Sequence, residues 1–306
     1  MSQQTVLLIM LLFASASVTG VIAAHSWRRR RIPGAAPFAV ACLFAALWPV
    51  GEAFQLSSRS LPVALFWLDV QYFSLAAIPV AWAAMSLQYV TGGKWLTPRG
   101  LLLISIIPAV TVLMVWTNDL HGLMWTRAQL DLSGPTPIIH KSWGPWFWVN
   151  GMYTYLLLLG SGALLTWTMM RSPGQFRGQP LSLLAGLAVP LIANVHYITV
   201  LAPKNQPDPT PILVGVGAAI CTWGLFRYGL FVVVPVAHSK VIEAMMDGVV
   251  VTDSLDHIVE INPAAEAILG ANRRAVIGSS VSSAFNAWPA LIGLYGKASD
   301  PYTVLV

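Results

Sequence analysis

The fold changes at Pro235-Val-Ala-His-Ser-Lys-Val-Ile-Glu-Ala-Met-Met-Asp-Gly-Val-Val-Val-Thr-Asp253, which Ile258-Val-Glu-Ile-Asn-Pro-Ala-Ala265 follows. The residues before this stretch are mostly apolar and predict a bundle of membrane helices. The residues from Gly248 onward predict a small soluble α/β domain. We therefore expect a transmembrane domain over 1–234, a connecting signalling helix over 235–247 and a partial soluble domain over 248–306, which is the layout of a transmembrane sensor.

The composition argues against a soluble enzyme and against a nucleic-acid-binding protein. Of the 306 residues, 56% are hydrophobic and only 9% are charged, and the mean hydropathy is +0.68. Soluble domains carry about 25% charged residues. The basic excess lies in residues 1–234, which hold 13 Lys and Arg against 5 Asp and Glu. Basic residues in short membrane loops set orientation, so membrane lipid is the expected partner and nucleic acid is not.

Seven stretches are long and apolar enough to cross a bilayer, which takes roughly 20 mostly apolar residues in a helix. They are 4–24, 36–56, 62–90, 100–117, 145–170, 180–200 and 211–234. Pro79, Pro108 and Pro190 lie inside three of these spans. We expect them to kink the helices, because neighbouring groups in a bundle can satisfy the freed carbonyls.

Basic residues in the loops predict the orientation of the bundle. The loop after the first span is Trp27-Arg-Arg-Arg-Arg31, and the loops on that side hold nine basic residues against four on the other. Cytoplasmic loops carry the excess, so we expect the N-terminus outside and the C-terminus in the cytoplasm, in the cell inner (plasma) membrane. A neutral Met1–Thr5 precedes the first span, whereas a signal peptide begins with positive charge, so we expect this span to be retained.

Short polar and aromatic signatures follow one another in order through the bundle. They are Leu47-Trp48-Pro-Val-Gly51 with Leu56-Ser-Ser58, Trp67-Leu-Asp-Val-Gln71-Tyr72 with Ile78-Pro79, Ser86-Leu-Gln88-Tyr89, Ile107-Pro108, Thr117-Asn118-Asp-Leu-His121-Gly-Leu-Met-Trp125, Gly144-Pro-Trp-Phe147, Val189-Pro190 with Asn194, Pro209-Thr-Pro211, and Arg227 leading to Val234-Pro235-Val236-Ala237. This ordered set resembles the N-terminal seven-transmembrane-helix sensor region of bacterial histidine kinases. The resemblance implies a sensory protein of a two-component system, in a family that usually continues into a PAS domain and a kinase core.

Two places depart from the pattern of that family. Members often carry an aromatic residue where this chain has Glu52, and a glutamate where it has Gln55. Residues three apart share a helix face, so the carboxylate is displaced by about one turn. Phe73-Ser74 also stands where a glycine is usual. Both departures concern the ligand and leave the expected architecture unchanged.

The cytoplasmic end resembles the start of a PAS domain. Gly248-Val-Val-Val-Thr-Asp253 and Ile258–Ile261 predict two strands. Asn262 is expected to cap a helix that has Pro263 at its first position and ends at Gly270. Too few residues follow for a complete PAS fold or a kinase core, so we expect a fragment that ends within this domain. The expected fold is an all-α membrane bundle of seven transmembrane helices followed by a truncated α/β PAS domain.

Two carboxylates inside the predicted spans are the first candidates for a ligand site. Glu52 and Asp69 are the only acidic residues in those spans, and both are expected in the outer halves of adjacent helices. Charged groups in a bilayer are costly and usually face the bundle interior, so we expect the two to line one cavity. The other predicted walls are Trp48, Tyr72, Asn194 and His196. A mixed aromatic and polar lining suits a small-molecule ligand of unknown identity, and a structural polar contact between helices is the alternative.

No metal site is predicted. The long outer loop holds Asp119, His121, Asp131 and His140, but their irregular spacing matches no metal-ligand signature, so a solvated loop is expected.

No cofactor is predicted either. Cys42 and Cys221 fall within apolar runs and are expected to be buried as small hydrophobes, in preference to a disulfide or a metal pair. No cysteine follows the helix that Asn262 begins, which argues against a flavin adduct in the PAS domain. His257 lies in a predicted turn and is a poor candidate for a haem ligand.

The connecting helix is expected to pair with a second copy. Val241, Ile242, Met245 and Met246 form an apolar stripe on it, so we expect a homodimer through the first three of these residues.

The leading functional hypothesis is the sensory portion of a membrane-bound histidine kinase, which detects a small extracellular or membrane-dissolved ligand and relays it through the PAS domain. The sensory portion of a diguanylate cyclase is the alternative, because the chain contains no catalytic domain. A retinal receptor needs a buried lysine, whereas Lys94, Lys141 and Lys204 all fall in predicted loops. A transporter lacks evident repeats, and an intramembrane enzyme lacks a catalytic motif.

Overall fold

The computed structural model of this chain describes residues 2–93, 95–172, 177–201, 206–228, 245–252, 256–270, 272 and 276–286. Two compact units divide the chain, Met1–Val233 and Val234–Val306. The first unit is mainly helical, and the second combines short strands with short helices.

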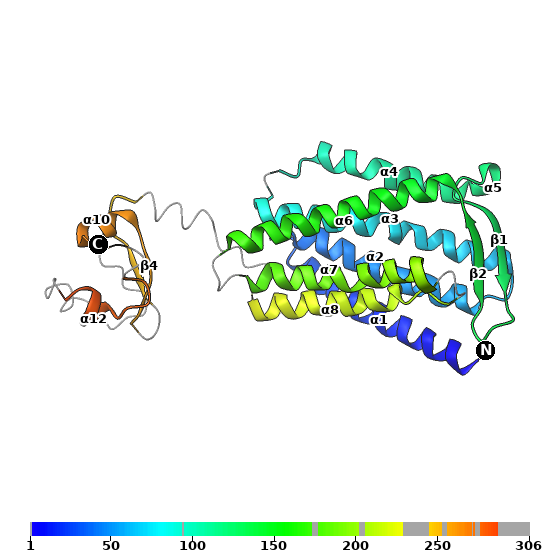
Figure 1. Cartoon of the computed structure of the whole chain (residues 1–306), viewed down its shortest axis with the longest axis horizontal. Coiled ribbons are helices and arrows are strands. Elements are labelled where there is room, and N and C mark those ends of the chain that lie inside the picture. The colour runs from blue at the N-terminus through cyan, green and yellow to red at the C-terminus, as the bar shows by residue number, and fades with distance from the viewer. Residues whose placement is uncertain are drawn as a thin grey trace. The chain divides into compact units, whose positions relative to one another are not determined.

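Long helices lying side by side make up the first unit (Figure 1). They are α1 (Gln3–Arg28), α2 (Ala35–Ser57), α3 (Leu61–Thr91), α4 (Pro98–Trp116), α6 (Pro145–Arg171), α7 (Gly178–His196) and α8 (Thr210–Tyr228). In the described part of the chain, five helical segments are long and apolar enough to cross a bilayer, namely α1 to α4 and Gly178–Leu201. Thr210–Gly224 is a shorter apolar helix. This unit is therefore a helical membrane bundle.

The ends of the helices follow local capping chemistry. The Ser2 hydroxyl accepts a hydrogen bond from the Thr5 amide at the start of α1 (3.1 Å), and Thr97 does the same for Gly100 at the start of α4 (3.0 Å). Gly92 ends α3 at φ +62°, a left-handed conformation that favours glycine. The first six predicted stretches overlap α1, α2, α3, α4, α6 and α7, and the sixth consists of α7 followed by a π-helical turn, η2 (Tyr197–Leu201). The seventh overlaps α8, and its residues 229–234 lie outside the described residues.

A β-hairpin occupies the long loop between α4 and α6. A short helix, α5 (Asn118–His121), leads into antiparallel strands β1 (Trp125–Asp131) and β2 (Ile138–Trp143). The sequence predicts a solvated loop here, and the hairpin within it was not predicted. Two β-rich runs separated by a turn containing Gly134-Pro135 are a hairpin signal that could have found it.

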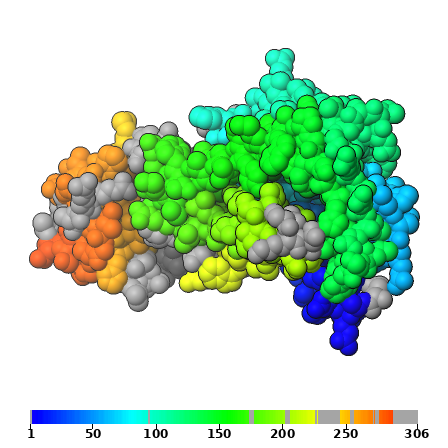
Figure 2. Space-filling model, turned by 45° about the vertical axis from the view of Figure 1, so that its right-hand side comes forward, coloured from blue at the N-terminus to red at the C-terminus, as the bar shows by residue number. Residues whose placement is uncertain are grey.

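Hydrogen bonds hold the hairpin to the bundle. The buried Asn118 amide accepts from the Met124 backbone N–H and donates to the Trp125 carbonyl, both at 2.9 Å. At the hairpin turn, the Pro135 carbonyl accepts from the hydroxyls of Ser2 (2.5 Å) and Thr5 (2.7 Å). Figure 2 shows the green hairpin reaching across one end of the bundle to the dark-blue start of α1. The chain's N-terminus and the hairpin therefore share one end, which we call the hairpin end.

A buried apolar cluster lies toward the opposite end of the bundle. It includes Phe38, Met85, Leu165 and Leu183, each at most 1% exposed. Cys42 and Cys221 belong to the same cluster and are buried free thiols, as expected from the sequence.

Glycines bring α7 and α8 into close contact. A Cβ added at Gly217 would lie 2.4 Å from the Gly186 carbonyl oxygen, and one added at Gly186 would lie 2.2 Å from the Cys221 sulfur. The two helices therefore contact each other through their backbones, which leaves no space for a side chain at either position.

The second unit contains the strands and helix that the sequence predicts for the start of a PAS domain. Strands β3 (Val250–Thr252) and β4 (Ile258–Ile261) pair antiparallel, and the helices are α10 (Pro263–Leu269) and α12 (Val281–Ala284). Asn262 caps α10 by accepting from the Ala265 amide at 2.9 Å, and Gly270 ends it at φ +59°. The same Asn262 side chain donates to the Asp247 carbonyl at 2.8 Å, so it also fixes the position of the backbone just before β3.

Most of the predicted connecting helix, including Val241 and Ile242, lies outside the described residues. Met245 and Met246 are described, and both are exposed.

Candidate ligand site

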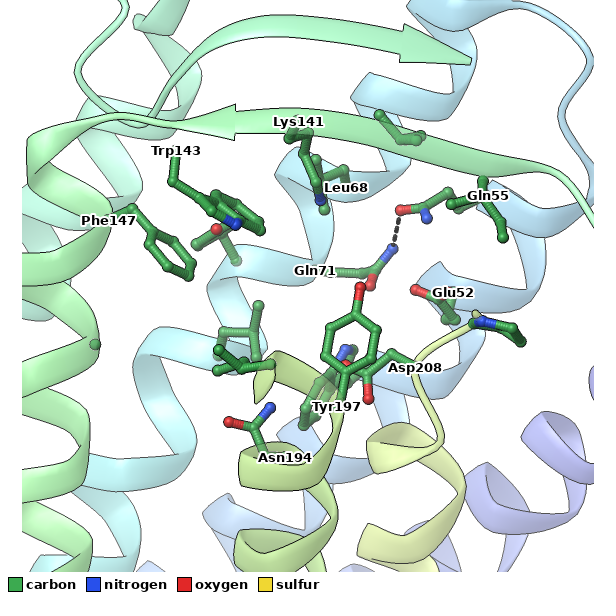
Figure 3. Close-up of a pocket in the computed structure, with 18 of the residues that line it drawn as sticks. Glu52, Gln55, Leu68, Gln71, Lys141, Trp143, Phe147, Asn194, Tyr197 and Asp208 are labelled. Carbon is green, nitrogen blue, oxygen red and sulfur yellow. Dashed lines mark hydrogen bonds between the residues drawn. The ribbon is translucent and has the colours of Figure 1, made fainter. Parts of the chain in front are cut away.

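A cavity of about 180 Å³ lies among the helices at the hairpin end. Side chains from α2, α3, β2, α6, α7, η2 and the loop before α8 line it (Figure 3). We call this cavity the outer chamber. Segments that are distant in the sequence therefore meet at one site, as a binding site within a bundle requires.

Three charged side chains line the outer chamber. Glu52 comes from α2 and is 8% exposed, Asp208 comes from the loop before α8, and Lys141 reaches down from β2 (Figure 3). Across the described ranges, the one ion pair within 4.0 Å joins His140 to Asp131. The Lys141 ammonium therefore forms no ion pair with either carboxylate, and space remains for a ligand among the three groups.

Burial changes the acid–base behaviour of the two charged groups that lie outside the helices. Loss of water lowers the pKa of Lys141 to about 8, although the carboxylates of Glu52 and Asp208 act in the opposite direction. Burial likewise raises the pKa of Asp208 to about 6, against hydrogen bonds from Thr210 and the charge of Lys141. Both groups are thus held where a ligand's charge can alter their protonation.

Amide side chains line the same chamber and are held by hydrogen bonds. Gln71 donates to Gln55 at 2.9 Å across the α2–α3 interface (Figure 3), and the Tyr155 hydroxyl donates to Asn194 at 2.7 Å across the α6–α7 interface. These bonds orient the amides without occupying all of their donors and acceptors.

Aromatic rings complete the wall beneath the hairpin. Trp143 and Phe147 are stacked with ring centroids 3.8 Å apart. The Lys141 ammonium lies 4.9 Å from the Trp143 ring centroid, within the range of a cation–π interaction. The rings therefore help to hold the lysine over the chamber.

The structure brings together four of the six predicted site residues. Trp48, Glu52, Tyr72 and Asn194 all line the outer chamber.

Asp69 and His196 are not among the residues that line the chamber. The face of α3 that lines the chamber consists of Leu68, Gln71, Tyr72 and Leu75. Asp69 follows Leu68 and points about 100° away from it around the helix axis. One carboxylate oxygen of Asp69 is buried without a hydrogen-bond partner among the described residues.

On the sixth apolar stretch, Asn194, Tyr197 and Ile198 face the chamber, and His196 is exposed. Glu52 and Asp69 therefore do not line one common cavity as expected. Which side chains meet depends on the rotation of each helix about its axis as well as on their depth in the bundle.

The sequence reasoning missed Lys141 and Asp208. Lys141 was assigned to a solvated loop, because the hairpin that carries it over the chamber was not predicted. Asp208 accepts a hydrogen bond from the Thr210 backbone N–H at 2.8 Å, which is the local turn typical of an Asp two residues before a helix start. That spacing could have marked the position, but its place in the chamber depends on tertiary packing.

A second, mainly apolar cavity of about 140 Å³ lies deeper between the helices, and we call it the inner chamber. Residues of α2, α3, α6, α7 and α8 line it. Trp48, Leu75, Thr154, Tyr155 and Asn194 line both chambers. We call these shared residues, which lie between the polar and the apolar compartment, the neck; the Tyr155–Asn194 hydrogen bond joins two of them.

The four residues considered as metal ligands lie in α5 and the hairpin, namely Asp119, His121, Asp131 and His140. Asp131 accepts hydrogen bonds from the Ser133 hydroxyl and amide and pairs with His140, which together hold the pKa of Asp131 down at about 2. In the residues that the structure describes, no group of three or more His, Cys, Asp or Glu side chains could hold a metal ion. The Asp131–His140 pair thus stabilises the hairpin turn.

Comparison with known families agrees with this architecture. The family model described as the N-terminal 7TM region of histidine kinase matches residues 11–235. A PAS domain model matches residues 238–298. No curated protein matches the chain.

Proposed function

The chain belongs to the family of N-terminal 7TM regions of histidine kinases, and we propose from this premise that a small ligand binding in the outer chamber controls a membrane-bound kinase. The chain is a multi-pass membrane protein that combines the sensor region with a PAS domain. The observation that carries the proposal is the chamber itself, where Glu52, Asp208 and Lys141 meet without closing into an ion pair. Charged groups inside a helix bundle that do not pair with one another favour a ligand that interacts with them.

We propose that the hairpin end faces outward from the cell inner (plasma) membrane. All seven long helices then cross the membrane, including α6, whose 27 residues exceed a bilayer span. The four arginines at 28–31 follow the far end of α1, away from the hairpin. An outward hairpin end places the chamber where an extracellular or membrane-dissolved ligand can reach it, and it places the arginines in the cytoplasm.

Helix α8 is the proposed route from the ligand to the PAS domain. Val214, Gly217 and Ala218 of α8 line the inner chamber, and Asp208 lies just before the helix in the outer chamber. A ligand that binds one packing of α7 and α8 better than another shifts the population towards it. Residues 235–247 then carry the change to the PAS domain, in a homodimer through Val241, Ile242 and Met245.

The test compares two conservative variants with a matched control in membranes that contain the full-length kinase. Glu52→Gln and Asp208→Asn remove charge from the chamber, so we expect autophosphorylation to change by about tenfold in either direction, which is a shift of about 1.4 kcal/mol. Asp119→Asn removes an exposed carboxylate that does not line the chamber and should leave activity near that of the wild type. Equal activity in all four proteins would contradict the proposal.

A further inference from the structure

The two chambers have opposite chemistry and share one neck. Among the described residues, the outer chamber carries two carboxylates, Glu52 and Asp208, against one ammonium, Lys141. The inner chamber is lined mainly by apolar side chains such as Phe38, Leu158 and Leu187. A molecule that fills both compartments therefore needs a polar end and an apolar end.

The charge of the outer chamber selects the sign of the polar end. With two acidic groups against one basic group, the ionised chamber carries a net negative charge and favours a cation. Tyr72, Tyr197 and Trp48 also line it, and aromatic rings beside a carboxylate are a favourable environment for an ammonium group. An anionic ligand would instead meet two carboxylates in a site with little water.

A buried donor defines the inner chamber further. Trp82 lines this chamber and is 8% exposed, and its indole N–H has no hydrogen-bond partner among the described residues. Buried donors in proteins are normally satisfied, because an unmade hydrogen bond is costly. One acceptor oxygen on an otherwise apolar ligand would satisfy this indole.

We propose that the site binds a small amphipathic amine, with its ammonium in the outer chamber between Glu52 and Asp208 and its apolar part passing the Trp48–Asn194 neck into the inner chamber. This inference rests on the proposed function, because it names the ligand class of that same site. The chambers are small, at about 180 and 140 Å³, whereas drug-sized ligands occupy pockets of about 300–1,000 Å³. A short-chain amine therefore fits the space better than a two-chain lipid.

The first experiment measures binding of four probes to the chain in phosphatidylcholine nanodiscs, by the shift of the thermal unfolding midpoint with probe concentration. The probes are n-hexylamine, methylamine, n-hexanol and hexanoate. We expect n-hexylamine to bind at least about tenfold more tightly than each of the others, because it alone has both the cationic and the apolar part. Tighter binding of hexanoate, equal binding of hexanol, or no saturable binding of any probe would overturn the inference.

Variants assign the two parts of the ligand to the two chambers. Glu52→Gln should weaken n-hexylamine about tenfold and leave hexanol unchanged. Asp119→Asn, at an exposed position that does not line the chamber, should change neither. Ala45→Leu places a larger side chain in the inner chamber and should remove the advantage of hexylamine over methylamine. Ala109→Leu, on the exposed face of α4, is the matched control and should retain that advantage.

Further arms separate the possible sources of the amine and the possible failures. Replacing part of the phosphatidylcholine by phosphatidylethanolamine should not mimic n-hexylamine if the ligand is a free amine. Protection by phosphatidylethanolamine alone would contradict the short-chain ligand. If the probes fail but the Glu52 and Asp208 variants still change autophosphorylation, the amine inference is wrong and the proposed function stands. If those variants also leave autophosphorylation unchanged, the proposed function fails too.

Discussion

The two ends of the bundle are built differently. At the hairpin end, charged and amide side chains line the outer chamber, and Glu52, Lys141 and Asp208 remain apart from one another. Toward the opposite end, Leu165 and Leu183 lie in a buried apolar cluster. Closely packed side chains transmit small shifts because they leave few voids. We therefore expect the hairpin end to respond to a ligand, and the apolar cluster to keep the helices together and to pass the response on.

The contact between α7 and α8 joins these two regions. It begins beside the inner chamber, where Gly186, Gly217 and Pro190 line the wall, and it continues to Cys221 in the apolar cluster. Because Gly217 leaves no space for a Cβ, a small change in the chamber wall must move one helix relative to the other. The comparison thus predicts that perturbing this contact has a larger effect on stability than perturbing the hairpin or the chamber charges.

Gly217→Ala should have the largest effect. Its added Cβ would lie 2.4 Å from the Gly186 carbonyl oxygen, so the helices must separate, at a cost of about 1–3 kcal/mol in the free energy of unfolding. Gly160→Ala on α6 is the matched control, because a Cβ there meets no atom within 4 Å. That substitution should stabilise the helix by about 0.5–1 kcal/mol. Unfolding in detergent measures both, and equal stabilities would show that the α7–α8 contact is looser than described.

Asn118→Ala should have the next largest effect, mainly on the hairpin. It removes hydrogen bonds to the backbone of Met124 and Trp125 and leaves those buried groups unpaired, at a cost of about 1–3 kcal/mol. Amide hydrogen exchange over β1 and β2 should become faster while α7 and α8 stay protected. Ser142→Ala, at an exposed position of β2, is the control and should leave exchange in the strands nearly unchanged. Unchanged protection in the Asn118 variant would contradict its anchoring role.

The chamber charges should have a smaller effect on stability, and this effect depends on pH. The pKa of Asp208 is raised from 3.8 to about 6 in the folded state, so its contribution is present at low pH and is lost as pH rises from about 4 to 6. The pKa of Lys141 is lowered from 10.5 to about 8, so the cost of its buried charge is relieved as pH rises from about 8 to 10.5. Asp208→Asn should flatten the acidic part of the stability profile, and Lys141→Met the basic part.

Asp131 on the hairpin is the control, because its pKa is lowered whereas that of Asp208 is raised. Hydrogen bonds from Ser133 lower the pKa of Asp131 to about 2, so its contribution is gained as pH rises from about 2 to 4. Asp131→Asn should therefore change the pH dependence of stability only below the range of the other two variants. The chamber account predicts three separate pH windows, and a shared window for all three variants would contradict it.

The sequence predicted most of the helices and the start of the PAS domain because those features depend on local chemistry. Apolar runs define the spans, and Asn262, Pro263 and Gly270 mark the ends of one helix by capping and backbone preference. The hairpin was missed because β1 and β2 show no clear alternation of buried and exposed residues. Local features therefore predict elements with clear caps or β-branched runs well, and strands without such a pattern poorly.

The site was only partly predictable for a related reason. Glu52 was found because a carboxylate inside a span is unusual by itself. Asp69 has the same signature, yet it lies outside the chamber, since the rotation of α3 about its axis depends on neighbours that no local pattern reveals. Lys141 and Asp208 come from loops whose position depends on the completed bundle.

The central claim is that the hairpin end holds a ligand chamber open to the outside of the cell. Cysteine accessibility tests it most directly, in a variant in which Cys42 and Cys221 are replaced by alanine. Gln55→Cys lines the outer chamber, and Ser172→Cys follows α6 at the opposite end. The account predicts that a membrane-impermeant trimethylammonium thiosulfonate modifies residue 55 in intact cells and residue 172 only after permeabilisation. Modification of residue 172 from outside, with residue 55 protected, would contradict it.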